Sequence, residues 1–352
     1  MFYELENRLL NFLSRPPVDR SVQFSNGLAV GSLQGPERKE NQDRALVAIV
    51  TDLGLPPKVI AVVCDGLGGM SEGGKAAEIA LSSFVATIAR QHTLLSEWLL
   101  QDAINHANRA VFGEVRGDGG ATLAAVAFEP GRGVWIAHVG DSRVYSSLAG
   151  GQLRLHTKDD TLTSLANTDL PSSDDELDNR LVQFVGSSSH IEPHISKDVG
   201  FAKRLLITTD GAHGLGKHIL EGIERSATSC ADWIKKLTYV AEATSVRDNA
   251  TAIAISVEDI DFSRLPTHGW SINLWSASEA LEICFSDLHS FTNESVHDRP
   301  VEPLTDQWDQ SKNQTQPRKP TRKQEPVQTR KTSTGRSKPR SQLKIDFKDN
   351  AD

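Results

Sequence analysis

Four aspartates stand where short apolar runs of the sequence end or begin. These residues are Asp65, Asp141, Asp210 and Asp248. A buried strand that ends in a carboxylate places an anion at the rim of a sheet, and Asp43 is a fifth candidate of this kind. Several carboxylates gathered at one rim are the oxygen ligands that hard divalent cations prefer. The sequence therefore predicts a cation-binding cluster, although each Asp-Gly pair taken alone is typical of a turn.

Mg²⁺ and Mn²⁺ prefer carboxylate, carbonyl and water ligands in octahedral geometry. Two such ions need a bridging carboxylate, and a water molecule shared by them loses a proton near neutral pH and becomes a nucleophile. Asp65 suits the bridging role, because the glycines after it allow an unusual turn and the Gly66 carbonyl can face a metal. Asp210 and Asp248 could close the site. We therefore expect two ions of Mn²⁺ or Mg²⁺.

An arginine lies close to this set in the sequence. Arg38 precedes Asp43 by five residues, and a guanidinium beside metals can hold two oxygens of a phosphate at once. The neighbouring Lys39 and Arg44 are interpreted as residues of surface ion pairs. The sequence thus predicts a site for a phosphate group next to the metals.

Apolar spacing predicts the elements that position these residues. Helical spacing covers 72–91 and 96–115, and strand-like runs cover 28–33, 44–50 and 59–64. Four closely spaced strands (121–128, 134–139, 143–148 and 152–157) indicate an antiparallel meander, and a strand at 204–209, helices near 215–226 and 230–244 and a strand at 250–257 follow. Strands in two blocks with helices between them favour an α+β sandwich of two sheets. Trp98, Trp135 and Trp233 lie on apolar faces and are expected in the core.

The chain of 352 residues is predicted to comprise four regions. They are an N-terminal extension (1–21), a catalytic domain (22–261), an appended apolar or helical segment (262–292) and a basic disordered tail (293–352). Residues 311–345 hold eleven Lys and Arg against one acid, whereas the remainder has 27 bases and 45 acids. We expect no nucleic acid on the acidic body, whereas the tail could bind one.

No run of eighteen apolar residues is present, so no membrane association is expected. Three cysteines without metal-finger spacing fit a reducing, cytoplasmic location.

Six ordered pieces of the sequence resemble metal-dependent protein phosphatases of type 2C, of the bacterial kind. The pieces are Arg38-x-x-Asn41-Gln42-Asp43, Asp65-Gly66-Leu67-Gly68-Gly69, Gly120-Ala121-Thr122, Val139-Gly140-Asp141-Ser142-Arg143, Thr209-Asp210-Gly211 and Asp248-Asn249. Asn179 with Gly186 also fits, and the resemblance spans residues 22 to 258. Such a set in order is far more specific than one short motif.

The resemblance implies a four-layer α-β-β-α sandwich, in which two antiparallel sheets are flanked by helix pairs. It implies that Asp65 bridges two ions, that the Gly66 carbonyl binds one, and that Asp210 and Asp248 bind the other. Asp43 would act through water, Asp141 would bind a looser third ion, and Arg38 would grip the substrate phosphate. Arg143 is interpreted as structural and paired with a neighbouring acid.

The sequence departs from the family pattern at several positions. Gln42 replaces a common Glu, and Asp159-Asp160-Thr161 replaces a common Asp-His-Ser. Leu67 stands where some members carry a proton-donating His, so a metal-bound water or His213 could serve instead. Gly214 stands where members often carry an Asp for the third metal, which leaves a third ion undecided.

We predict a protein serine/threonine phosphatase that hydrolyses phosphoserine and phosphothreonine with a metal-activated water. The catalytic residues would be Arg38 and Asp65. The alternative is a catalytically weak phosphatase-like scaffold that binds a kinase or phosphoprotein through its tail. Expected partners are a phosphorylated protein substrate and, in a regulatory role, a Ser/Thr kinase.

Overall fold

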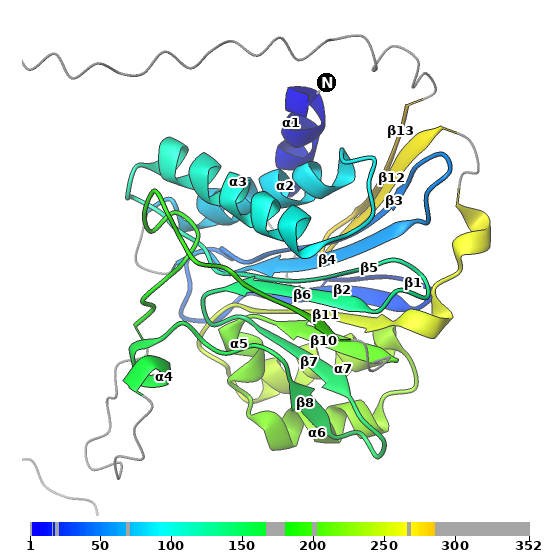
Figure 1. The fold of residues 1–352 in the computed structure, drawn as a ribbon. Helices are drawn as coiled ribbons and strands as arrows, with labels where there is room; N and C mark the ends of the chain where they lie inside the picture. Colours follow the sequence, from blue (N-terminus) through cyan, green and yellow to red (C-terminus); the bar gives the residue numbers. More distant parts are fainter. Residues whose placement is uncertain are drawn as a thin grey trace, which may run out of the picture. The chain divides into compact units, whose positions relative to one another are not determined.

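Two antiparallel sheets lie face to face, and helices cover their outer faces (Figure 1). The structure is a computed structural model that describes residues 2–15, 17, 21–67, 71–166, 180–198, 203–265 and 269–285. The first sheet contains, in spatial order, β1 (Ser21–Ser25), β2 (Leu28–Leu33), β11 (Ala250–Ser256), β10 (Arg204–Thr208), β7 (Arg143–Ser147) and β8 (Leu153–Leu155). The second contains β13 (Ala280–Phe285), β12 (Trp270–Ser276), β3 (Arg44–Thr51), β4 (Lys58–Cys64), β5 (Leu123–Phe128), β6 (Val134–Val139) and β9 (His194–Asp198).

Two helices, α2 (Gly73–Ala89) and α3 (Glu97–Val115), cover the second sheet, and α1 (Phe2–Leu13) packs on α2. The first sheet is covered by α6 (Lys217–Ser226) and α7 (Cys230–Ala243). Ser96 and Ser229 cap α3 and α7, since each side chain accepts a hydrogen bond from a backbone N–H of the first turn. The remaining short elements are α4 (Leu162–Ala166), α5 (Asp210–His213), η1 (Val257–Asp259) and η2 (Phe262–Arg264). This arrangement confirms the predicted α-β-β-α sandwich.

The continuous apolar runs in the central strands follow from this layering. Side chains alternate between the two faces of a strand. In β3, Val47 and Ile49 pack between the sheets, whereas Leu46 and Ala48 pack against the helices. Both faces of the strand are therefore dry, and a run without polar residues is what such a strand requires.

The predicted meander over 121–157 is wrong. β5 and β6 pair in the second sheet, whereas β7 and β8 pair in the first, so the chain changes sheets between Val139 and Arg143. Gly140, with φ of +98°, makes that turn possible. Close spacing of strands indicates a sheet-like region, but it does not specify which sheet each strand joins.

The described part of the segment that follows the predicted catalytic domain is a β-hairpin and not a helix. Residues 262–292 were expected to be an appended apolar or helical segment, but β12 and β13 form a hairpin that extends the second sheet beside β3. Trp270, Ile272 and Leu274 are buried by this addition. Helical structure in the described part is limited to the single turn η2. The basic tail at 293–352 lies outside the described residues.

The expected N-terminal extension begins with α1, which is buried against α2. Leu5, Leu9, Phe12 and Leu13 join the same apolar core as α2 and α3. This helix is thus part of the sandwich and not a separate appendage.

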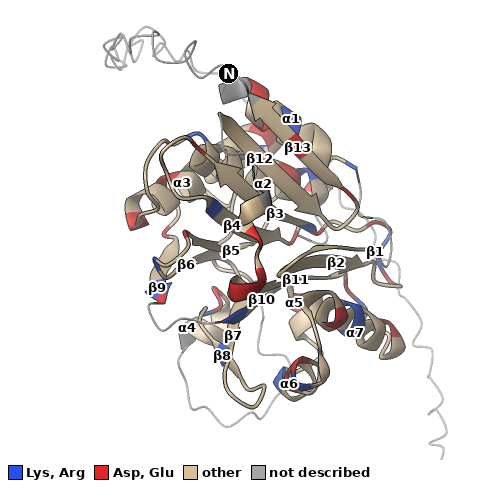
Figure 2. Cartoon of the chain, turned by 90° about the vertical axis from the view of Figure 1, so that its right-hand side faces the viewer, with Lys and Arg blue, Asp and Glu red and all other residues tan. Residues whose placement is uncertain are grey.

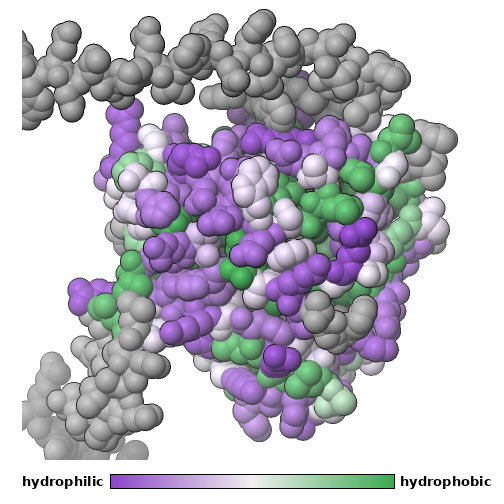
Figure 3. All heavy atoms as spheres, viewed as in Figure 1, coloured by the Kyte–Doolittle hydropathy of each residue, from purple (hydrophilic) through white to green (hydrophobic). Residues whose placement is uncertain are grey.

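The described surface is mixed in charge and polarity. Figure 2 shows basic and acidic residues together on α6 and α7, and pairs such as Lys236–Asp232 join them. On the face in Figure 3, hydrophobic residues occur in small groups between hydrophilic ones. Trp233 is fully buried as predicted, but Trp98 is 68% exposed, so its assignment to the core is wrong. None of the described helices is long and apolar enough to cross a membrane.

The hairpin yields a test of stability. Leu274 and Leu281 are cross-strand partners, yet Leu274 is fully buried and Leu281 is 38% exposed. We expect Leu274→Ala to lower the free energy of unfolding by about 2–5 kcal/mol, because it leaves a cavity in the core. Leu281→Ala, the matched control, should cost clearly less. Equal losses in urea denaturation would contradict the placement of β12 in the sheet.

Candidate metal centre

Four of the predicted aspartates meet at one end of the sandwich because of strand register. Arg44 pairs with Cys64, so Asp43 before β3 and Asp65 after β4 lie at the same edge. In the other sheet Thr208 pairs with Ala252, which brings the start of α5 beside the residues that precede β11. Those neighbouring positions carry the two remaining acids, Asp210 and Asp248.

The pKa values of these acids show that they lie within electrostatic reach of one another. Burial raises the pKa of Asp43 to about 7, and the charges of Asp210 and Asp248 contribute in the same direction. Burial, with the charges of Asp43 and Asp210, raises the pKa of Asp65 well above its usual value. The pKa of Asp210 is also raised, by burial and by Asp248. Like charges held together out of water demand protons or cations as compensation.

The donor set fits a hard divalent cation. Among the described residues, Asp43 Oδ1 and Asp210 Oδ1 are buried without a hydrogen-bond partner. Buried polar atoms are normally paired, so such atoms in a cluster of acids mark a place for a ligand. All candidate donors are oxygens, which suits Mg²⁺ or Mn²⁺.

One contact already occupies part of this set. Asp248 Oδ2 accepts a hydrogen bond from Arg38 Nη2. Within the described ranges, no three His, Cys, Asp or Glu side chains form a ready-made metal cage. A cation held by Asp248 would therefore compete with Arg38 for that carboxylate.

The turn after Asp65 is fixed by close backbone packing. A Cβ atom at Gly66 would lie 2.4 Å from the Gly73 carbonyl oxygen, so only glycine fits there. Thr122 N donates to the Asp65 carbonyl (2.9 Å), and Asp65 N donates to the Thr122 hydroxyl (3.0 Å). Leu67 N donates to the Gly120 carbonyl (3.0 Å). The Gly120–Thr122 motif thus holds Asp65 in place, a role that the sequence alone did not suggest.

Asp43 is fully buried in a network of hydroxyl and amide groups. Thr209 Oγ1 donates to Asp43 Oδ2 at 2.9 Å, and Asp43 N donates to Asn41 Oδ1 at 3.1 Å. Asn41 Nδ2 in turn donates to Ser32 Oγ (2.8 Å), which is 2.7 Å from Thr251 Oγ1. Sequence reasoning missed these positioning residues, although Asn41 and Thr209 lie inside the recognised motifs.

Arg38 is paired with Asp248 of the cluster and is partly exposed, in a loop held by Asn249. Its pKa is raised by the hydrogen bond with Asp248, with smaller effects of the Asp65 and Asp210 charges. Asn249 Oδ1 accepts from Gly35 N and Asn249 Nδ2 donates to the Glu40 carbonyl, each at 3.2 Å. The structure therefore brings the predicted phosphate-binding arginine to the carboxylates.

Asp141 lies on the turn after Gly140, beside the four-aspartate cluster. Burial raises its pKa to about 7, with smaller contributions from Asp210 and Asp159. Arg143 donates to both carboxylate oxygens of Asp159 (3.0 and 2.6 Å), as expected for a structural arginine. Gly214 follows α5 and offers no side-chain ligand, so Asp141 receives no carboxylate partner from that position.

The two histidines near the site are structural. His213 is 9% exposed, its Nδ1 lies 3.2 Å from Thr208 Oγ1, and burial lowers its pKa to about 3. It is therefore neutral near pH 7 and does not supply a proton. His138 stacks on His194 with ring centres 4.7 Å apart and contacts the Lys158 carbonyl.

Comparisons with known proteins agree with this architecture. The sequence model of the family described as Protein phosphatase 2C matches residues 37–252, and no curated protein matches the chain. The PPM Ser-Thr phosphatase MsPP from Mycobacterium smegmatis, solved with cacodylate, is 27% identical with a TM-score of 0.54 and covers 67% of this chain and 99% of its own.

Two further solved structures share the fold at lower identity. The serine/threonine phosphatase of S. agalactiae is 22% identical with a TM-score of 0.56 and covers 65% of this chain and 99% of its own. The Mycobacterium tuberculosis serine/threonine phosphatase PstP/Ppp is 22% identical with a TM-score of 0.55 and covers 66% and 99%.

The buried acids predict that divalent cations stabilise the fold. At a Mn²⁺ concentration of 100 times the dissociation constant, binding should raise the free energy of unfolding by about 2.7 kcal/mol. This gain corresponds to a rise of roughly 5–10 °C in the melting temperature. Asp210→Asn should lose most of this gain, because it removes a proposed ligand and relieves the repulsion that the cation offsets. Differential scanning calorimetry with Mn²⁺ and with EDTA measures both. Glu282→Gln on β13 is the control, and an equal gain in Asp210→Asn would exclude Asp210 as a ligand.

Proposed function

The chain belongs to the protein phosphatase 2C family, and we propose that it hydrolyses phosphoserine and phosphothreonine in proteins with the help of two Mn²⁺ or Mg²⁺ ions. It is thus a phosphoprotein phosphatase, a hydrolase of phosphoric monoesters. The observation that carries the metal-dependent mechanism is the convergence of four aspartates, of which Asp43 is fully buried, with Arg38 at one end of the sandwich.

We assign the ligand roles to this chain as follows. Asp65 would bridge two cations, the Gly66 carbonyl would complete one coordination sphere, and Asp210 with Asp248 would hold the other ion. Asp43 lies deepest and would act through an intervening water molecule. When bound, such a pair of cations lowers the pKa of a water molecule and stabilises negative charge on phosphoryl oxygens.

Arg38 would bind and orient the phosphate. A guanidinium offers five N–H donors in a planar fork, which matches the oxygens of a phosphate. The contact with Asp248 uses Nη2, and Nε and Nη1 would be the donors that Arg38 offers to the phosphate. Asp248 also limits the rotation of the guanidinium, which keeps Arg38 close to the place where the phosphate enters.

Water would protonate the leaving group in this chain. Leu67 has no proton to give, and His213 is neutral, buried and hydrogen-bonded to Thr208. A third cation would have Asp141 as its proposed ligand but would gain no carboxylate from Gly214, and Asp159 is engaged by Arg143. We therefore propose catalysis by the two-cation site.

The substrate is proposed to be a phosphorylated protein, and a Ser/Thr kinase is a further candidate partner. The tail that could tether such a partner lies outside the described residues. The scaffold alternative predicts that calorimetric titration finds no tight pair of ions. Binding of two Mn²⁺ ions would therefore favour the enzyme over the scaffold.

The metal requirement is tested with p-nitrophenyl phosphate and a phosphothreonine peptide. We expect hydrolysis with Mn²⁺ or Mg²⁺, none with EDTA, and recovery when the cation is returned. Asp65→Asn and Asp210→Asn should lose more than about 100-fold in kcat/KM, since even outer-shell partners of metals cost roughly 10- to 100-fold. Glu282→Gln should match the wild type. Full activity of either aspartate variant would refute the assignment.

The role of Arg38 is tested separately. Arg38→Ala removes a charge-assisted contact worth about 1.5–3 kcal/mol, so kcat/KM should fall roughly 10- to 150-fold. Mn²⁺ affinity, measured by calorimetry, should not weaken, because the variant frees Asp248. A large loss of Mn²⁺ affinity with unchanged KM would show that Arg38 serves the metals and not the phosphate.

A further inference from the structure

A buried arginine links the N-terminal helix to the aspartate cluster. Arg44 directly follows Asp43 and is only 6% exposed, so its interpretation as a surface ion-pairing residue is wrong. From its contacts we infer that Arg44 is a positioning residue for Asp43, and that it couples helix α1 to the proposed metal site. This inference rests on the proposed function.

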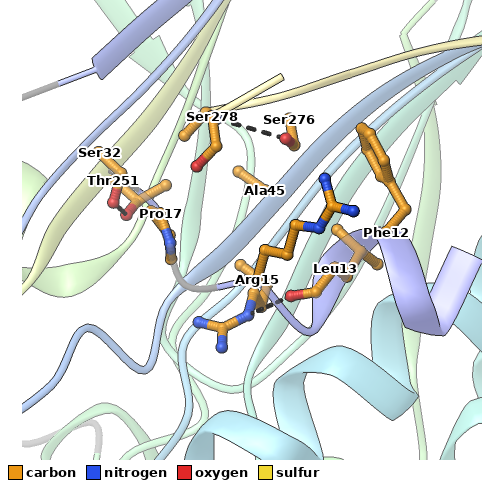
Figure 4. A pocket seen from close by; sticks show the side chains of 11 residues that line it. Phe12, Leu13, Arg15, Pro17, Ser32, Ala45, Thr251, Ser276 and Ser278 are labelled. Atoms are coloured by element: carbon orange, nitrogen blue, oxygen red, sulfur yellow. Dashed lines mark hydrogen bonds between the residues drawn. The ribbon is translucent and has the colours of Figure 1, made fainter. Parts of the chain in front are cut away.

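The guanidinium of Arg44 joins three segments that are distant in the sequence. Nε donates to the carbonyl oxygen of Leu13, the last residue of α1, at 2.9 Å. Nη1 donates to the carbonyl oxygens of Asn41 and Asp43, both at 2.9 Å. Nη2 is paired with Glu78 on α2. Figure 4 shows Leu13 at the end of its helix, with a dashed line at its carbonyl oxygen that marks this bond.

This set of partners requires an arginine. The side chains of Arg44 and Glu78 are 7% and 13% exposed, so the charge and its counterion are both largely out of water. A planar guanidinium donates in several fixed directions at once, whereas a lysine ammonium is a single point with three donors on a flexible stem. Loss of Arg44 would leave Glu78 buried without its partner and three carbonyl oxygens short of a donor.

The contacts bear directly on the backbone that carries Asp43. Two of them hold the carbonyl groups of Asn41 and of Asp43 itself, on either side of Gln42. The carboxylate of Asp43 is directed at Thr209 and is fully buried, so a small rotation of this backbone would displace it. Arg44 thus fixes the main chain, while Thr209 fixes the side chain.

Helix α1 is a firm anchor for this arrangement. Leu9 is fully buried and Leu13 is 2% exposed, both within the core formed with α2 and α3. Glu6 accepts a hydrogen bond from Ser83 and is paired with His106 at 3.8 Å. The helix lies outside residues 37–252, so the family match does not account for this buttress.

The experiment compares Mn²⁺ affinity in Arg44 variants with a matched control. Arg44→Met and Arg44→Lys should raise the calorimetric dissociation constant for Mn²⁺, and the Mn²⁺ concentration for half-maximal activity, by roughly 10- to 100-fold. At saturating Mn²⁺, kcat should stay close to wild type, because no group that contacts substrate is lost. The control is Arg204→Met, which breaks another partly buried ion pair, Arg204–Glu224, between β10 of the first sheet and α6.

The outcomes are distinguishable. Wild-type Mn²⁺ affinity in folded Arg44→Lys would overturn the inference, as would an equal loss in Arg204→Met. If Arg44→Met does not fold, the inference is tested with Arg44→Lys and Leu9→Ala. Leu9→Ala loosens the packing of α1 and should therefore also raise the dissociation constant for Mn²⁺. Wild-type protein that neither binds Mn²⁺ nor hydrolyses phosphate esters would instead refute the proposed function.

Discussion

The gathering of buried carboxylates at one end of the sandwich is the constraint that governs this structure. Desolvation penalises each charge, and the neighbouring acids add to the penalty, which is why burial and charge together raise the pKa of Asp43, Asp65 and Asp210. A protein keeps such an arrangement only if the rest of the fold holds it in place. The geometry of the sandwich is organised around that requirement.

Strand register and close backbone contacts keep the aspartates together at this end of the sandwich. The pairings of β3 with β4 and of β10 with β11 bring strand ends together that are distant in the sequence. Glycines then let the connecting segments touch, because a Cβ at Gly66 would strike Gly73 and one at Gly211 would lie 2.1 Å from the Asn249 carbonyl oxygen. These contacts involve main-chain atoms, so they cannot relax as a flexible side chain could. The acids are consequently confined by the backbone itself.

Much of this could be predicted from the sequence, and the failures have physical causes. The buried strands β3 and β4 and the helices α2 and α3 were located almost to the residue, because burial on one or both faces leaves a clear apolar pattern. The pairing partner of each strand could not be predicted in the same way, because the alternation of apolar and polar residues within β7 does not specify which sheet the strand joins.

The missed elements had weak local signals. The edge strand β9 was not predicted, because His194–Asp198 is polar and mostly exposed. The hairpin of β12 and β13 alternates Trp, Ile and Leu with polar residues, and that short pattern was interpreted as an appended or helical segment. Arg44 was placed on the surface because arginine is seldom buried, and only tertiary contacts reveal its partners.

The loop from Gly35 to Asp43 shows how positioning is divided in the site. Asn249 holds the first part of this loop through Gly35 and Glu40, and Arg44 holds the last part through Asn41 and Asp43. The loop carries both Arg38, which is proposed to bind the phosphate, and Asp43, the most deeply buried acid of the cluster. The contacts that hold the loop come from two parts of the fold. Asn249 lies in the segment before β11, and Arg44 is itself bonded to the end of α1. The distance between the phosphate and the metals would therefore be set by packing across both sheets, and elements outside the family match contribute to it.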